Sequence, residues 1–192
     1  MTLRRGTRTP LAGSASLSPQ RKWRAITIAT VVLAPAMWSI VIGVVAVGSD
    51  DADAPAAGPL LALGLCVIPF VFLALAFLSE HPRPSSAVSA AMVLCVLVGI
   101  PVSAFAGDAV TGLVAGIGAG GVVALRADLD HTWKARALAV LAASAYAFVF
   151  VRLAGELLLL ISPVLPFTSL GVVDHLSERR ATRRRAAPVG RS

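Results

Sequence analysis

The hydrophobic residues of this chain form long, nearly uninterrupted blocks, and the polar residues lie between these blocks. The apolar blocks are about 17 to 25 residues long and end at charged residues or at Gly, Pro and Ser. An α-helix rises about 1.5 Å per residue, so roughly 20 apolar residues cross the ~30 Å hydrocarbon core of a bilayer. The pattern predicts an all-α, polytopic integral membrane protein with six transmembrane helices in three hairpins. The expected spans are residues 25–47, 59–78, 87–106, 109–125, 137–151 and 157–173.

The segments before and after these blocks are polar and basic. Residues 1–24 carry Arg and Lys among Ser, Thr, Pro and Gly, a composition that buries too little apolar surface to fold. We therefore expect residues 1–24 to form a disordered cytoplasmic tail, residues 25–176 the transmembrane helical domain, and residues 177–192 a second basic cytoplasmic tail. Basic residues beside membrane spans bind anionic lipid. The residues expected to do so are Arg21, Lys22, Arg24, Arg179, Arg180, Arg183, Arg184 and Arg185.

Composition supports the membrane class and argues against nucleic acid as a partner. Charged residues make up 14% of the chain, whereas a soluble domain carries about 25%. The net charge is +7 and the mean hydropathy is +0.82. However, the basic residues flank apolar blocks, and no aromatic residues interleave with them to stack on bases. Arg outnumbers Lys 15 to 2 and the sequence has no Asn, which is typical of a GC-rich genome. We expect a bacterial inner-membrane protein.

The last apolar region permits two interpretations. Residues 137–161 are apolar except for Arg152 and Glu156, which are one helical turn apart and able to pair. In the first interpretation, a single fifth helix carries both charges inside the bilayer. In the second, the fifth helix ends near Val151, the two charged residues flank an outer turn, and residues 157–173 form a sixth span kinked at its two prolines.

The distribution of basic residues favours six spans. With the N-terminus in the cytoplasm, six spans place 16 of the 17 Lys and Arg residues on the cytoplasmic side and leave only Arg152 outside. Five spans would place the six arginines after residue 176 on the outer side, against the positive-inside rule. We therefore expect both termini in the cytoplasm.

Small residues recur every four positions in the fourth span. Gly112, Gly116 and Gly120 lie on one face, where another helix can approach the backbone closely. We expect this face to pack against a row of alanines on the fifth span, or to contact a second copy or another membrane protein. Residues 116–121 also match the GxGxxG pattern, but a dinucleotide site needs a preceding strand and an exposed loop, so we reject it. The residues expected in helix packing are Gly112, Ala115, Gly116, Ala119, Gly120, Ala139, Ala143 and Ala147.

No catalytic set, cofactor or metal site is expected. The acidic segments 50–53 and 128–131 lack further converging ligands and are expected to be solvated loops. The leading hypothesis is a non-enzymatic accessory or assembly component of the membrane. The alternative is a small transporter or channel that uses Arg152 and Glu156 together with prolines in the middle of the spans. These prolines are Pro35, Pro69 and Pro101. The two cysteines, Cys66 and Cys95, are expected to be small buried residues.

Overall fold

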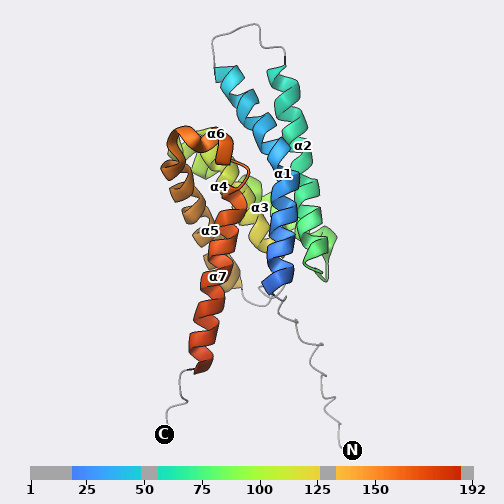
Figure 1. Ribbon diagram of the computed structural model, residues 1–192, viewed down its shortest axis with the longest axis vertical. Helices are drawn as coiled ribbons and strands as arrows, with labels where there is room; N and C mark the ends of the chain where they lie inside the picture. Colours follow the sequence, from blue (N-terminus) through green and yellow to red (C-terminus); the bar gives the residue numbers. More distant parts are fainter. Residues whose placement is uncertain (1–18, 49–55, 126–132, 187–192) are drawn as a thin grey trace, which may run out of the picture.

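The structure is a computed structural model that describes residues 19–48, 56–125 and 133–186 of the 192-residue chain. All regular structure in these residues is helical, as predicted (Figure 1). The elements are α1 (Pro19–Gly48), α2 (Ala57–Leu78), α3 (Pro84–Ala106), α4 (Ala109–Leu125), α5 (Trp133–Ala154), the 3₁₀ turn η2 (Gly155–Leu157), α6 (Leu158–Ile161) and α7 (Leu165–Ala186).

Four of the described helices have the length and apolar composition needed to cross a membrane. These are α1, α2, α3 and the part of α5 that begins at Arg136. Helix α4 is also apolar but has only 17 residues. Pro35, Pro69 and Pro101 lie inside α1, α2 and α3, and each helix continues through its proline. The predicted class, an all-helical protein with membrane-length apolar helices, is confirmed.

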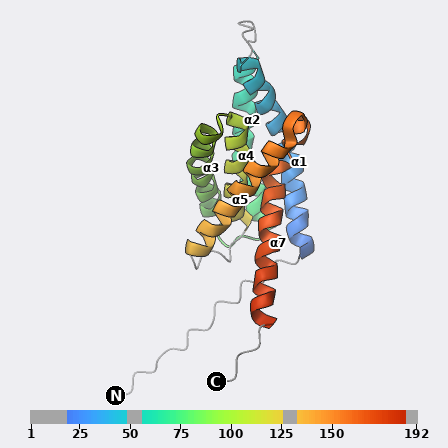
Figure 2. The ribbon, with the colours of Figure 1, turned by 90° about the vertical axis from the view of Figure 1, so that its left-hand side faces the viewer.

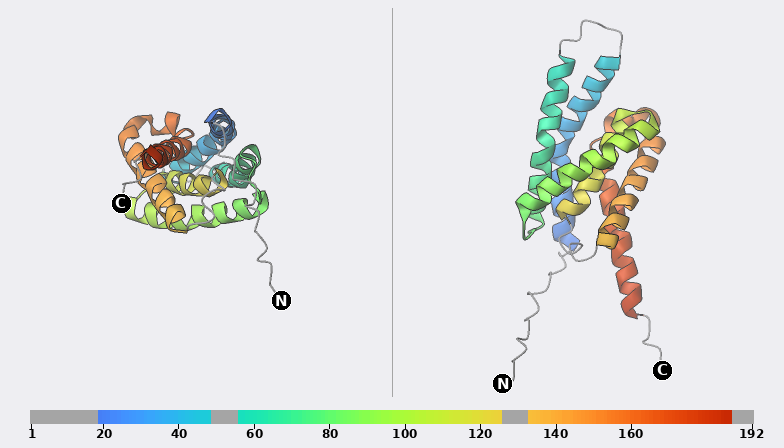
Figure 3. Two further views of the ribbon diagram at one scale, coloured as in Figure 1. Left: turned by 90° about the horizontal axis from the view of Figure 1, so that it is seen from below. Right: turned by 180° about the vertical axis from the view of Figure 1, so that it is seen from behind.

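Helix α4 occupies the centre of the bundle. Fifteen of its 17 residues are buried, and it packs against α2, α3, α5 and α7. Seen from below, α4 lies between α3, the pair formed by α1 and α2, and α5 with α7 (Figure 3, left). A helix that is apolar on every side is stable where other elements cover every side. The composition of α4 therefore explains its central place.

Helices α1 and α2 form a long antiparallel pair. A Cβ atom added at Gly64 would lie 2.7 Å from the carbonyl oxygen of Ala36, and one added at Gly43 would lie 3.1 Å from that of Ala57. Figures 1 and 2 show the ends of α1 and α2 projecting beyond α3 to α6 at one end of the bundle. Helix α7 projects at the opposite end. The bundle is therefore longer along α1 and α2 than along α4.

The predicted boundary of the N-terminal tail is wrong. Helix α1 begins at Pro19, so residues 19–24 are helical, while residues 1–18 lie outside the described part. Proline is well accommodated in the first turn of a helix because its missing N–H has no intrahelical partner there. The turn that follows packs against the bundle: Lys22 is only 7% exposed and Ala25 is buried. Tertiary contacts thus extend the helix into a segment that is polar in sequence.

The chain beyond α5 also differs from the prediction. The single fifth helix of the first interpretation does not form, because α5 ends at Ala154 and Gly155 adopts a positive φ of 51°. The predicted sixth span of the second interpretation is not one continuous helix, since residues 162–164 separate α6 from α7. Pro163 lies in this break and Pro166 in the first turn of α7. Helix α7 then continues to Ala186 through much of the predicted C-terminal tail.

Candidate functional site at helix α4 and its two polar ends

Three glycines of α4 lie directly against the backbone of α3. A Cβ atom added at Gly112, Gly116 or Gly120 would lie 2.4, 2.4 and 2.7 Å, respectively, from an α3 carbonyl oxygen. Only a residue without a side chain fits at such distances, and small residues let membrane helices gain van der Waals contact. The carbonyl oxygens belong to Gly99, Cys95 and Ala91, in that order, so α3 and α4 are antiparallel.

This contact corrects the predicted partner of the glycine face, which is α3 and not α5. The alanines expected to oppose it lie on α5, where Ala143 and Ala147 are fully buried and Ala139 is half-buried. Helix α5 packs on α4 as well. The two remaining predicted packing residues, Ala115 and Ala119, are fully buried on α4.

Two further glycines of α4 face α7. A Cβ atom at Gly118 would lie 2.8 Å from the Ser169 hydroxyl, and one at Gly121 would lie 3.3 Å from the Leu170 side chain. The Ser169 hydroxyl donates a hydrogen bond to the carbonyl oxygen of Pro166. These glycines do not belong to the four-residue row of Gly112, Gly116 and Gly120. They are three residues apart and therefore lie on a second face of the helix.

The N-terminal end of α4 is closed by an aspartate. Gly107 ends α3 with a positive φ of 68° and donates its N–H to the carbonyl oxygen of Ser103 at 2.9 Å. The Asp108 carboxylate then accepts hydrogen bonds from the N–H groups of Val110 (3.0 Å) and Thr111 (2.9 Å), and from the Thr111 hydroxyl. These bonds satisfy amides that have no partner within the helix.

Arg152 joins the end of α5 to the end of α3 beside this turn. Its Nη2 donates a hydrogen bond to the carbonyl oxygen of Ala106 at 2.9 Å, and its guanidinium lies 5.2 Å from the centre of the Phe148 ring. The side chain remains exposed. The predicted partner Glu156 lies in η2, but its side chain is outside the described part of the structure, so the pairing stays a prediction.

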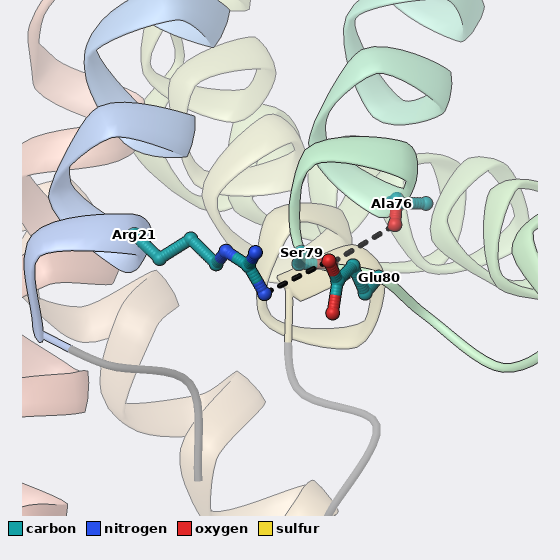
Figure 4. A network of polar contacts seen from close by, with 4 residues as sticks. All are labelled: Arg21, Ala76, Ser79 and Glu80. Carbon is teal, nitrogen blue, oxygen red and sulfur yellow. Dashed lines mark hydrogen bonds and ion pairs between the residues drawn. The ribbon is translucent and has the colours of Figure 1, made fainter. Parts of the chain in front are cut away.

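The C-terminal end of α4 meets the turn that follows α2. The Ser79 hydroxyl shares its one proton between the carbonyl oxygens of Ala76 (3.1 Å) and Ala124 (3.2 Å), and so links α2 to the last turn of α4. Beside it, Glu80 forms an ion pair with Arg21 of α1 at 2.8 Å (Figure 4). Glu80 has a positive φ of 53°, a conformation that glycine usually supplies at this position of a helix end. The ion pair between Glu80 and Arg21 links α1 to the turn after α2.

His81 follows in the same turn and is almost completely buried. Its Nδ1 accepts a hydrogen bond from the N–H of Arg83 at 3.1 Å, and its Nε2 has no hydrogen-bond partner among the described residues. An accepting Nδ1 requires the proton of the neutral ring to be on Nε2. Burial chiefly, with a contribution from the charge of Arg136, lowers the pKa of His81 below its ordinary value of 6.5. The imidazole is therefore neutral at pH 7.

The other predicted residues lie as follows. Arg24 and Arg179 are exposed, whereas Lys22 is buried and so does not extend freely toward lipid headgroups. Cys66 is exposed on the outer face of α2, contrary to expectation, and Cys95 is buried against α4.

Within the described residues, no three His, Cys, Asp or Glu side chains are grouped to hold a metal ion. The segments 50–53 and 128–131 and the side chains of Arg180, Arg183, Arg184 and Arg185 lie outside the description.

Comparison with protein-family models, with curated proteins and with solved structures finds no match to this chain. The class of protein therefore rests on the helices themselves. Their length, their apolar composition and the central, glycine-packed α4 define a membrane-embedded helical bundle.

Proposed function

We propose that the chain is a six-pass protein of a bacterial inner membrane, with both termini in the cytoplasm, and that it acts as a non-enzymatic accessory or assembly component. The observation that carries this proposal is the closed packing around α4. The backbone of α3 lies directly against three glycines of α4, and α7 contacts Gly118 and Gly121. Helices α2 and α5 cover the remaining sides of α4. Such a bundle is a compact body whose outer faces are available to lipid and to other membrane proteins.

The topology is supported by the distribution of charge along the bundle. The start of α1, the turn between α2 and α3, the start of α5 and the polar part of α7 all lie toward one end (Figure 1). Arg21, Arg24, Arg83 and Lys134 are exposed at this end. Positive charge is enriched on the cytoplasmic side of bacterial inner-membrane proteins. We therefore assign this end to the cytoplasm and count α6 and α7 together as the sixth pass.

The surface that meets a partner would be one of the outward apolar faces, because α3 already occupies the glycine row of α4. Leu63 on α2, Leu97 on α3 and Leu141 on α5 are more than 60% exposed. In vivo photo-crosslinking from each position tests the proposal, with Val114, which is fully buried, as the matched control. We expect adducts of one defined mass from one of the three faces and none from Val114. A monomer with no protein adduct at any of the three positions would contradict the accessory role.

A transporter or channel is the second candidate, and the break between α6 and α7 favours it. Helix α7 starts beside the middle of α4, because a Cβ atom at Gly118 would lie 3.3 Å from the carbonyl oxygen of Pro166. In secondary transporters, discontinuous helices at mid-membrane depth form substrate and ion sites. Flux measured in proteoliposomes tests this candidate. Equal flux in wild type, Arg152→Ala and Glu156→Ala would mean that neither charged residue takes part in transport.

A further inference from the structure

Helix α4 is shorter than α1 and α2, although its C-terminal end lies at the same level as the start of α1 and the end of α2. The Ser79 hydroxyl contacts the C-terminal turn of α4, and the adjacent Glu80 contacts the first turn of α1 through Arg21. From this common end, the 17 residues of α4 extend about 26 Å, whereas residues 21–47 of α1 extend about 40 Å. The other end of α4 therefore falls short of the ends of α1 and α2, which project beyond it in Figures 1 and 2.

The projecting ends of α1 and α2 are apolar and exposed. Val45 and Val47 of α1 are 63% and 66% exposed, so their stable surroundings are hydrocarbon and not water. If hydrocarbon covers these residues, the turn between α3 and α4 lies below the level of the headgroups. A membrane accommodates a short helix by local thinning and by side chains that reach toward the headgroups. The leaflet beside this turn should therefore be thinner than the leaflet beside α1 and α2.

Arg152 is an exposed, charged side chain beside the turn between α3 and α4. The hydrogen bond to Ala106 and the contact with the Phe148 ring fix the guanidinium on the surface of the bundle. Among the described residues, no other hydrogen bond occupies its remaining N–H donors. The nearby Asp108 carboxylate accepts bonds from the amides of α4. A guanidinium is always charged, is costly in hydrocarbon, and matches a phosphate group with its planar array of donors.

We propose that Arg152 binds the phosphate of a phospholipid headgroup, which descends to the level of the α3–α4 turn where the leaflet is thin. The phosphate would accept hydrogen bonds from the guanidinium N–H groups that face away from Ala106, while the acyl chains lie along the exposed face of α3. Phe105, which is 84% exposed at the end of α3, borders this position. The proposal rests on the membrane class of the bundle, and it gives Arg152 a role other than the charged pair with Glu156 that the transporter candidate uses.

Phospholipid affinity tests the proposal first. Binding of phosphatidylglycerol to the purified full-length protein in detergent is measured by native mass spectrometry. Because a hydrogen bond to a charged group contributes about 1.5–3 kcal/mol, Arg152→Gln should weaken the tightest lipid binding about tenfold or more. Arg152→Lys keeps the charge and should weaken it less. Arg83→Gln removes an exposed charge at the opposite end and serves as the matched control.

Three outcomes of this experiment would overturn the proposal. Equal affinity in wild type and Arg152→Gln would mean that the guanidinium does not bind the headgroup. An equal loss in Arg83→Gln would mean that net charge alone is responsible. Binding of inorganic phosphate that depends on Arg152, with phospholipid affinity unchanged, would identify a site for free phosphate instead of a lipid.

Depth in the membrane provides a second test. Nitroxide labels are placed at Phe105→Cys and Val45→Cys in a chain without Cys66 and Cys95, and the protein is reconstituted in lipid nanodiscs. A thinned leaflet predicts that a water-soluble relaxation agent reaches position 105 at least as well as position 45, and less well when Arg152→Gln is added. Access of oxygen but not of the water-soluble agent at position 105 would place it in ordinary hydrocarbon and contradict the proposal.

Discussion

Gly116 is the position at which the packing around α4 makes its sharpest prediction. A Cβ atom there would lie 2.4 Å from the carbonyl oxygen of Cys95 and 3.2 Å from its Sγ. Ordinary contact begins near 3.4 Å, so α3 and α4 must separate by about 1 Å to accept a methyl group. The obstacle is helical backbone, which does not move aside as a side chain does.

The expected magnitude combines two opposing effects. Overpacking a close-packed interior costs about 1–3 kcal/mol. Replacing glycine by alanine inside a helix returns about 1 kcal/mol through helix propensity. Gly116→Ala should therefore lower the free energy of unfolding by up to about 2 kcal/mol, and Gly116→Val, which adds more volume at the same point, should lower it further.

Gly58 provides the matched control, because a Cβ atom at this position of α2 has no heavy atom within 4 Å. Gly58→Ala should leave stability unchanged or raise it by up to about 1 kcal/mol. The assay is reversible unfolding in mixed micelles, followed by tryptophan fluorescence and far-UV circular dichroism. If Gly116→Ala and Gly116→Val are as stable as Gly58→Ala, α3 and α4 are not in backbone contact and the reasoning fails.

Three further predictions concern the ends of α4 and the turn after α2. Because the pKa of His81 is lowered in the folded state, the unfolded state binds more protons as the pH falls below about 6.5. Thermal stability should decrease in that range, and less steeply in His81→Gln, as scanning fluorimetry from pH 7.5 to 5 will reveal. Glu80→Gly removes an exposed ion pair worth about 0–1 kcal/mol but relieves a left-handed conformation that costs about 1–2 kcal/mol, so its melting temperature should equal or exceed that of wild type. Asp108→Ala should cost about 0.5–2 kcal/mol through loss of the helix cap, while Asp108→Ser should restore much of it in denaturant titrations.

Helix α4 shows what the sequence could predict. Its observed bounds equal the predicted span of residues 109–125, because charged residues border an apolar block on both sides. The partner of its glycine face was harder to predict, because periodicity identifies a face but not the helix that covers it. A usable signal was present: α3 carries its own row of small residues four apart, and only Gly107 and Asp108 connect the two helices. Short connections favour antiparallel neighbours.

The region after α5 shows what the sequence could not determine. Pro163 and Pro166 indicated a weakened helix, but proline produces either a kink or an end, depending on the packing around it. The positive φ of Gly155 arises where the chain leaves α5 and has no periodic signature. Similarly, the start of α1 depends on Lys22 packing into the bundle, a tertiary contact that polar composition conceals. These differences all arise where the fold overrides local propensity.

The side of the membrane on which the C-terminus lies tests the six-pass arrangement most directly. A single reporter cysteine, Ser192→Cys, is introduced into a chain that lacks Cys66 and Cys95, and cells are treated with a membrane-impermeant maleimide. Asp51→Cys, in the segment assigned to the outer side, is the matched control and should react in intact cells. A six-pass protein with a cytoplasmic C-terminus predicts that Ser192→Cys reacts only after lysis. Reaction of Ser192→Cys in intact cells would contradict this arrangement and would place the polar part of α7 outside the cell.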